Sequence, residues 1–311
     1  MKTAIFEYGK QSLAEWIEKN RDCEKMVLVG EASCDLWDER FEDKLEDGSF
    51  RIRRETNIGW HSFDLLYGFD SIAKDFHPIE FDITDMDLDI NVDDLGENDC
   101  DCRPSFIFKM LANRKYGTRF VYHGDFLTTP DGKVLVHCNS EERTINVPEK
   151  TETIGRFAFA SMDDYCFSMV LPEGIVNIDD FAFINSELLH INFPDSLLSL
   201  GKHSFNGTGL GEVLLPDGIE EIPAGCFQFV YIERLRLPAN LKTIRCEAFV
   251  GLECEEIRLP ESVETVEWRA LEGYYKKIYI PKTIQELAHD FYYEEGIDFH
   301  FEECKPQIIM Y

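Results

Sequence analysis

Long apolar runs are missing from this chain of 311 residues. No stretch reaches the roughly 18 apolar residues that a membrane-spanning helix requires. The opening segment, MKTAIFEYGKQSLAEW, contains neither the apolar run nor the small-residue cleavage site of a secretory signal. We therefore expect a cytoplasmic protein without membrane association, whose ten cysteines are reduced.

Basic residues are also scarce, because 31 Lys and Arg face 60 Asp and Glu and leave a net charge of −29. A field of this sign repels phosphate, so we expect no direct binding of nucleic acid. The acid excess leaves two functional interpretations open: a basic protein partner, or mimicry of nucleic acid by an acidic inhibitor. In a third interpretation the acidic surface only keeps an elongated protein soluble.

Catalytic motifs are absent too. The sequence has no glycine-rich phosphate loop, Gly-x-Ser-x-Gly, His-Glu-x-x-His or dinucleotide fingerprint. Cys100 and Cys102 would supply only half of a zinc site. The run Asp85, Asp87 and Asp89 resembles a calcium loop, but Ile90 stands where that loop needs glycine. We therefore predict no enzymatic activity, no cofactor and no metal site.

What the chain does contain is a repeat. An apolar residue followed by proline recurs seven times at intervals of 21 to 24 residues. The seven prolines are Pro148, Pro172, Pro194, Pro216, Pro238, Pro260 and Pro281. Spacing this regular is typical of a solenoid, in which each unit buries its apolar face only by stacking on its neighbours.

The positions around each proline repeat as well. Six residues after it stands Ile, Leu or Val, and eleven after it stands an aromatic residue in six of the units. The position before that one, ten residues after the proline, is small in six units, from Ala158 to Ala270. The aromatic positions are Phe159, Phe183, Phe205, Phe227, Phe249 and Tyr292, with Leu271 in the remaining unit. Each unit also has a short alternating strand that the proline ends, because proline has no N–H for the ladder. Cys166, Cys226 and Cys254 occupy apolar or small positions, which predicts core residues.

This pattern resembles the BspA-type leucine-rich-repeat family, whose units read as an apolar-Pro pair, then Ile-Gly, then Ala-Phe. Ile154-Gly155-Arg156-Phe157-Ala158-Phe159 is one close match, and Leu200-Gly201-Lys202-His203-Ser204-Phe205 is another. The resemblance covers about residues 125–301. It implies adhesion and protein recognition, usually at a cell surface.

The sequence thus predicts two domains. Residues 125–311 should form a mostly-β leucine-rich-repeat solenoid of about seven 22-residue units, and residues 1–124 an α/β or α+β domain. In the latter we expect helices at 12–20, 33–46 and 103–113 and a buried strand at 26–30, from capping patterns and apolar periodicity.

The candidate partner-binding surface consists of strand positions that face outward. In the later units these positions form a basic-aromatic stripe: Arg234, Arg236, Arg258, Lys276, Lys277 and Tyr279. Asn192 and Leu214 extend the stripe to earlier units. Arg and Tyr are enriched at binding hot spots, so we predict that a protein partner binds here. In the alternative interpretation the arginines pair across strands with Glu212, Glu233 and Glu256.

The inhibitor hypothesis points to another surface. Residues 81–102 carry nine acids and no base. Its candidate acidic surface is Asp85, Asp87, Asp89, Asp93 and Asp94. Asp85, Asp87 and Asp89 alternate with apolar residues, which predicts a half-buried strand with a carboxylate face.

Overall fold

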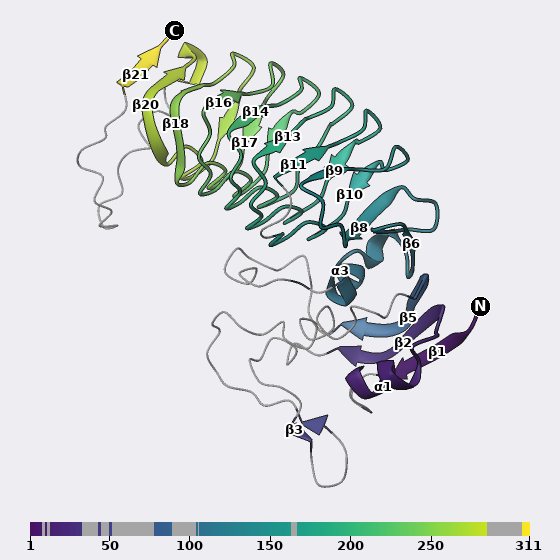
Figure 1. Ribbon diagram of the computed structural model, residues 1–311. Coiled ribbons are helices and arrows are strands. Elements are labelled where there is room, and N and C mark those ends of the chain that lie inside the picture. Colours follow the sequence, from purple (N-terminus) through teal and green to yellow (C-terminus); the bar gives the residue numbers. More distant parts are fainter. Residues whose placement is uncertain are drawn as a thin grey trace. The chain divides into compact units, whose positions relative to one another are not determined.

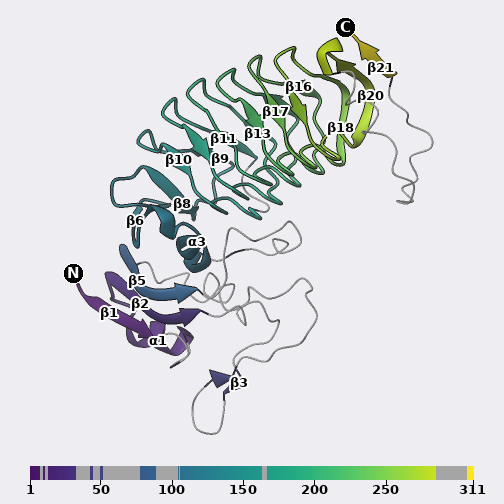
Figure 2. The ribbon, with the colours of Figure 1, turned by 180° about the vertical axis from the view of Figure 1, so that it is seen from behind.

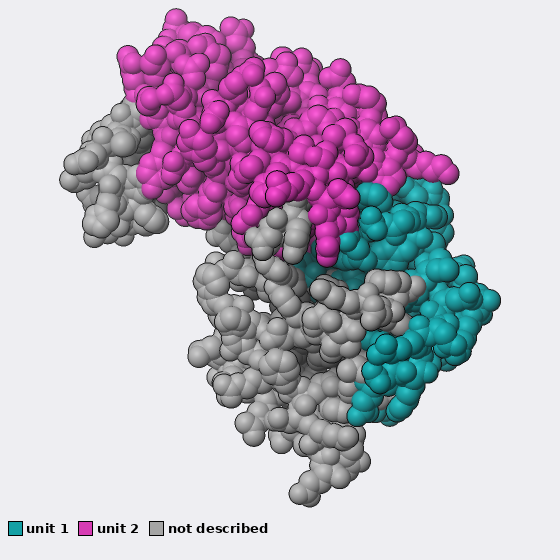
Figure 3. Space-filling model, viewed as in Figure 1, with its two compact units in different colours: residues 1–139 teal, residues 140–311 magenta. Residues whose placement is uncertain are grey.

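In the computed structural model the chain forms two compact units, residues 1–139 and residues 140–311 (Figure 3). The structure describes residues 1–7, 10, 13–32, 43–44, 50–51, 78–88, 104, 106–162, 167–284 and 307–311. Several residues singled out from the sequence lie outside these ranges, namely Asp89, Asp93, Asp94, Cys100, Cys102, Cys166 and Tyr292.

The first unit begins with a strand, a helix and a parallel strand. These are β1 (Thr3–Glu7), α1 (Leu13–Lys19) and β2 (Lys25–Ala32), and β1 pairs with β2 in parallel. Trp16 on α1 is buried, and its Nε1 donates a hydrogen bond to the Ile5 carbonyl at 2.7 Å. Met26 and Leu28 are fully buried, as expected for a core strand. The predicted first helix and first strand are therefore confirmed.

The sheet continues through β5 (Glu80–Leu88), β6 (Arg119–His123), β7 (Phe126–Thr128) and β8 (Val134–Cys138). β5 is parallel to β2, whereas β6, β7 and β8 add antiparallel strands. Helix α3 (Phe106–Ala112) is buried along its whole length, and Phe106 packs edge-on against Phe81 at 5.3 Å between ring centroids. It is followed by a short 3-10 helix, η4 (Arg114–Tyr116). The predicted helix at 103–113 is confirmed.

One predicted helix is wrong at its end. Residues 43 and 44, expected to be helical, form β3 (Asp43–Lys44) and pair with β4 (Phe50–Arg51) as antiparallel strands. The sequence between them contains Asp47-Gly48, a dipeptide typical of hairpin turns, and this signal outweighs the charged helical pattern. Residues 33–42 lie outside the described part of the chain.

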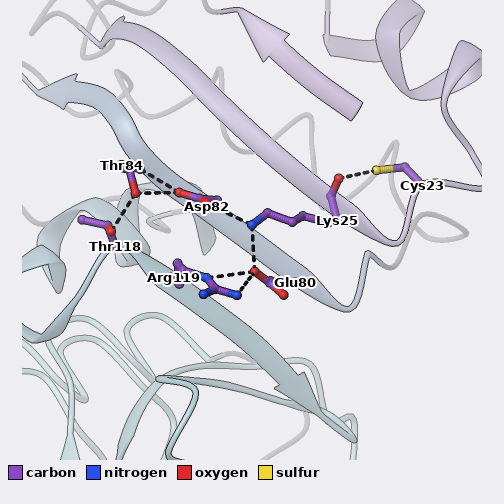
Figure 4. A network of polar contacts seen from close by, with 7 residues as sticks. All are labelled: Cys23, Lys25, Glu80, Asp82, Thr84, Thr118 and Arg119. Carbon is purple, nitrogen blue, oxygen red and sulfur yellow. Dashed lines mark hydrogen bonds and ion pairs between the residues drawn. The ribbon is translucent and has the colours of Figure 1, made fainter. Parts of the chain in front are cut away.

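An ion network joins three strands of the first unit (Figure 4). Lys25 Nζ on β2 lies 2.9 Å from Glu80 Oε1 and 3.0 Å from Asp82 Oδ2, both on β5. Arg119 on β6 donates to the same Glu80 oxygen, with Nε at 2.9 Å. The Lys25 ammonium lowers the pKa of Glu80, which is otherwise raised by burial. The network therefore stabilises the sheet across its strands.

The second unit is a solenoid of parallel coils, seen from two sides in Figures 1 and 2. Most coils contribute strands to two ladders, each of which is interrupted. The first ladder contains β9 (Thr144–Asn146), β11 (Ser168–Val170), β13 (His190–Ile191), β14 (Glu212–Leu214), β16 (Arg234–Arg236), β18 (Leu252–Arg258), β20 (Gly273–Ile280) and β21 (Gln307–Met310). The second ladder contains β10 (Thr153–Ile154), β12 (Asn177–Ile178), β15 (Glu221–Ile222), β17 (Thr243–Ile244) and β19 (Thr265–Val266). The first ladder consists of the sheets β9-β11-β13, β14-β16 and β18-β20-β21, and the second of β10-β12 and β15-β17-β19. All pairs within the ladders are parallel.

A ladder of phenylalanine rings fills the interior. Phe159, Phe183, Phe205, Phe227 and Phe249 stack in sequence with centroids 5.2, 5.0, 5.4 and 5.8 Å apart. All five are buried, and so are the small residues before them, such as Ala182, Ser204 and Cys226. The predicted packing of a large ring beside a small side chain is thus confirmed. Cys226 and Cys254 are buried, as predicted from their positions in the repeat.

Two positions recur in the left-handed backbone conformation, the first in six of the described coils and the second in five. The first lies nine residues after the proline, at Phe157, Phe181, His203, Gly225, Glu247 and Arg269. The second lies thirteen residues after it, at Ser161, Asn185, Gly207, Phe229 and Gly251. This conformation costs a residue other than glycine about 1–2 kcal/mol. Because the residue types at these positions vary so widely, the path of the coil imposes the conformation.

Candidate functional site

The basic-aromatic stripe lies on β16, β18 and β20 of the first ladder. Glu212 and Leu214 on β14 are paired in register with Arg234 and Arg236 on β16. Further along, Glu256 and Arg258 on β18 are in register with Lys277 and Tyr279 on β20. The outward positions therefore form two columns. One column alternates in charge, with Glu212, Arg234, Glu256 and Lys277. The other column consists of Leu214, Arg236, Arg258 and Tyr279.

The column that alternates in charge contains one ion pair among the described residues, between Arg234 and Glu212 at 2.5 Å. Next to this column, Lys276 pairs with Glu255. These side chains are mostly exposed, so each pair contributes little to stability. The interpretation that arginines pair across strands therefore holds for Arg234 but, among the described residues, not for Arg236 or Arg258.

Arg236 and Arg258 are different. Arg236 donates one hydrogen bond from Nη2 to the Leu215 carbonyl at 2.8 Å, and the Arg258 guanidinium lies 3.7 Å from the centroid of the Tyr279 ring. A second ring, that of Tyr311, lies 5.4 Å from the Arg258 guanidinium. Among the residues that the structure describes, no carboxylate forms an ion pair with either arginine. Both side chains are exposed, and we call them the two stripe arginines.

The remaining predicted positions differ in how much of each side chain is available to a partner. Asn192 uses its whole amide on the backbone of the preceding coil, accepting from Leu171 N at 2.7 Å and donating to Leu171 O at 2.8 Å. The Asn192 side chain therefore links the two coils here through hydrogen bonds to the Leu171 backbone. Leu214 is 37% exposed. Lys277 is exposed, and Tyr279 is half-buried beneath Arg258.

The side of the solenoid that follows the second ladder shows the opposite pattern. Arg245 contacts Glu221 and Glu267 at 2.7 Å each. The other cations with carboxylate partners here are Lys242 with Glu220, Arg269 with Glu247, and Arg156 with Asp180, at 2.8, 2.9 and 3.1 Å. These partners come from neighbouring coils and join one coil to the next.

The acidic surface of the inhibitor hypothesis is described only in part. On β5, Asp85 and Asp87 are exposed while Met86 is buried, which is the alternation predicted for this strand. Arg114 contacts Asp87 at 3.2 Å and donates to the Met86 carbonyl at 2.6 Å. Within the described ranges, no group of three His, Cys, Asp or Glu residues could hold a metal ion.

A family model describes the repeat region. The model of the BspA type leucine rich repeat region matches in six copies, over residues 135–251 and 220–302. Together the matches cover more than half of the chain. No curated protein sequence matches the chain. Among the described residues, no helix is long and apolar enough to cross a membrane.

Several solved structures are similar to parts of the chain. A leucine rich cell surface protein from Faecalibacterium prausnitzii A2-165 is 18% identical over 51% of this chain and 54% of its own, with a TM-score of 0.38. A leucine-rich repeat protein from Eubacterium ventriosum is 17% identical over 60% of this chain and 55% of its own, with a TM-score of 0.41. The pneumococcal vaccine antigen PcpA is 18% identical over 62% and 47%, with a TM-score of 0.35. The chain thus spans about half the length of these proteins.

Proposed function

Because the chain belongs to the BspA-type leucine-rich-repeat family, we propose that it recognises a protein partner through the basic-aromatic stripe. The observation that carries the proposal is the state of the two stripe arginines. Arg236 and Arg258 occupy the same column in neighbouring coils, exposed, and no carboxylate in the described part of the chain pairs with them. On a chain of net charge −29, two exposed arginines without a carboxylate partner among the described residues are unusual, and binding of a partner would explain them.

The geometry favours binding. An arginine offers five N–H donors in a planar fork, and Arg236 donates one of them to the Leu215 carbonyl. The Arg258 guanidinium is held over the Tyr279 ring, so less side-chain freedom is lost when a partner binds. An arginine anchored on an aromatic ring is also a residue type found at interface hot spots.

The test is charge reversal at both positions in the full chain. The variant Arg236→Glu/Arg258→Glu is compared with Lys150→Glu/Lys202→Glu, which changes the net charge equally at two exposed lysines outside the stripe. Partners are identified by mass spectrometry of proteins that the wild-type chain retains, and their affinities are then measured with purified components. We expect the stripe variant to weaken binding by about a hundredfold or more and the control variant to leave it within about threefold.

Equal binding by both variants would refute the proposal. If binding then also collapses as salt is raised from low to physiological concentration, the result supports the inhibitor hypothesis, in which residues 81–102 bind a basic target. Retained binding with little salt dependence would contradict both hypotheses. The expected cytoplasmic location stays a prediction.

A further inference from the structure

Three exposed aromatic side chains lie on the first and third of three consecutive coils of the second unit. Phe229, Tyr231 and Tyr274 are 61, 58 and 40% exposed. Tyr231 forms a parallel bridge with Glu253, and Glu253 is in register with Tyr274 on the next strand. None of the three aromatic residues belongs to the basic-aromatic stripe. Large exposed rings that gather in this way mark interaction surfaces more often than isolated ones.

Phe229 stands at a position where the fold does not need a ring. Its φ is +55°, in the left-handed column whose other members are Ser161, Asn185, Gly207 and Gly251. The ring lies against Gly251 of the next coil, where an added Cβ would come within 2.5 Å of the Phe229 Cδ1 atom. Gly251 therefore makes room for the ring. A bulky residue in an unfavourable conformation, with most of its ring exposed, contributes little to packing.

A carboxylate lies between the two tyrosines. Glu253 is exposed and forms no ion pair with any residue in the described ranges. The nearby cation Lys276 is held by Glu255 instead. Glu253 thus stands one strand spacing, about 4.8 Å, from an exposed tyrosine on either side.

We propose that this aromatic-carboxylate cluster, formed by Phe229, Tyr231, Glu253 and Tyr274, docks an arginine side chain of a protein partner. The faces of the three rings are negative and attract a guanidinium. The Glu253 carboxylate can accept two parallel N–H hydrogen bonds from the guanidinium. The charge of −29 on the chain also favours a cation over an anion. The cluster shares no residue with the stripe, although Lys276 of the stripe lies beside Tyr231. It suits a partner group of the opposite charge, so the inference goes beyond the proposed function.

The test uses the full chain and a labelled peptide of alternating glycine and arginine, at physiological ionic strength. Two counterparts carry lysine or uncharged citrulline in place of arginine. The variants are Tyr231→Ala, Glu253→Gln and Phe229→Ser, the last restoring a residue type found in the same column. The control is Glu261→Gln, which removes one charge from an exposed turn acid outside the cluster. Fluorescence anisotropy reports affinity, and circular dichroism confirms that each variant is folded.

We expect Tyr231→Ala and Glu253→Gln each to weaken binding of the arginine peptide about tenfold, and Phe229→Ser somewhat less. Glu261→Gln should leave affinity within about twofold, and the lysine peptide should bind less tightly than the arginine peptide. Equal losses from Glu253→Gln and Glu261→Gln would show that the acidic surface attracts the peptide without a site, and would overturn the proposal. So would equal binding of the citrulline peptide. Because this readout does not involve the two stripe arginines, its failure leaves the proposed function untouched.

Discussion

The two ladders of the solenoid treat positive charge differently. After the second-ladder strands, cations such as Arg245 and Arg269 contact carboxylates of adjacent coils. On the first ladder, Arg236 contacts only a backbone carbonyl and Arg258 only aromatic rings, as far as the structure describes the chain. Ion pairs on the second side therefore join coils. On the first ladder Arg234 and Lys276 also pair with carboxylates of adjacent coils, whereas Arg236 and Arg258 do not. Ion pairing, rather than residue type, separates these two arginines from the paired cations.

The largest expected effect concerns packing on the two sides. Gly201 directly follows the second-ladder positions of its coil, and a Cβ there would lie 2.2 Å from the Asp179 carbonyl carbon and the Asp180 nitrogen. Gly211 precedes β14 on the first ladder and has open space around it. We expect Gly201→Ala to lower the free energy of unfolding by about 3 kcal/mol because the backbone of the neighbouring coil must shift. Gly211→Ala should change it by less than about 1 kcal/mol.

Urea denaturation of both variants measures these free energies. Similar values for the two variants would show that the second-ladder side is no more tightly packed from coil to coil than the first. They would contradict the expected difference in packing between the two sides.

A smaller effect separates arginines that join coils from arginines that bind. Arg269 is 21% exposed at its side chain and contacts Glu247 at 2.9 Å. Arg269→Ala should cost about 1 kcal/mol of stability and leave partner binding intact. Arg236→Ala should change stability by no more than about 0.5 kcal/mol yet weaken binding. Thermal unfolding and affinity measured on the same two samples provide the check. Loss of both stability and partner binding in either variant would contradict the separation between arginines that join coils and arginines that bind a partner.

The smallest effect is a pH dependence. His203 follows a second-ladder position, and its ring stacks on Phe181 at 5.3 Å. Burial lowers the pKa of His203 below its ordinary value of 6.5, although Gln228, Glu247 and Asp180 act in the opposite direction. The unfolded chain therefore takes up a proton first as the pH falls. The stability that His203 contributes is complete above pH 6.5 and is lost as the pH falls through the lowered pKa.

His203→Phe places in this coil the residue that Phe157 and Phe181 provide in earlier coils. We expect it to reduce the loss of stability between pH 7.5 and pH 5, roughly the range over which histidine titrates. Exposed His190 on the first ladder is the control, and His190→Gln should retain the full loss. Denaturation at several pH values distinguishes them, and an unchanged profile in His203→Phe would contradict the assignment.

Much of the fold could be predicted because its determinants are periodic. The proline spacing located the coils, and the columns around Phe205 and Ile222 identified buried residues without any structure. The left-handed columns could not be found in this way, because Phe157, Glu247 and Arg269 share a backbone conformation but no residue preference. The helix expected to reach residue 46 was wrong at residues 43 and 44, which pair with residues 50 and 51. The sequence there holds both a charged helical pattern and the dipeptide Asp47-Gly48, which is typical of hairpins.

The candidate site was predictable in position but not in its chemistry. Outward strand positions follow from alternation alone, so Arg234 and Arg236 could be placed on one strand. Their different states depend on the neighbouring coil, where Glu212 reaches Arg234 and only a carbonyl reaches Arg236. Asn192 likewise forms backbone contacts that its type does not reveal. Equivalent positions in the repeat show which residues are neighbours. Side-chain geometry then decides which of these neighbours form hydrogen bonds or ion pairs.

The ladder of phenylalanine rings has a consequence for how such a chain changes over time. Each ring from Phe183 to Phe227 meets an equivalent ring on either side at nearly the same distance. A whole coil can therefore be duplicated or deleted by recombination while every interior contact keeps its kind. The length of the solenoid is free to vary in steps of one coil. Each newly copied coil also adds outward-facing positions that do not pack in the core. Substitutions at these positions can change binding specificity without disturbing the interior.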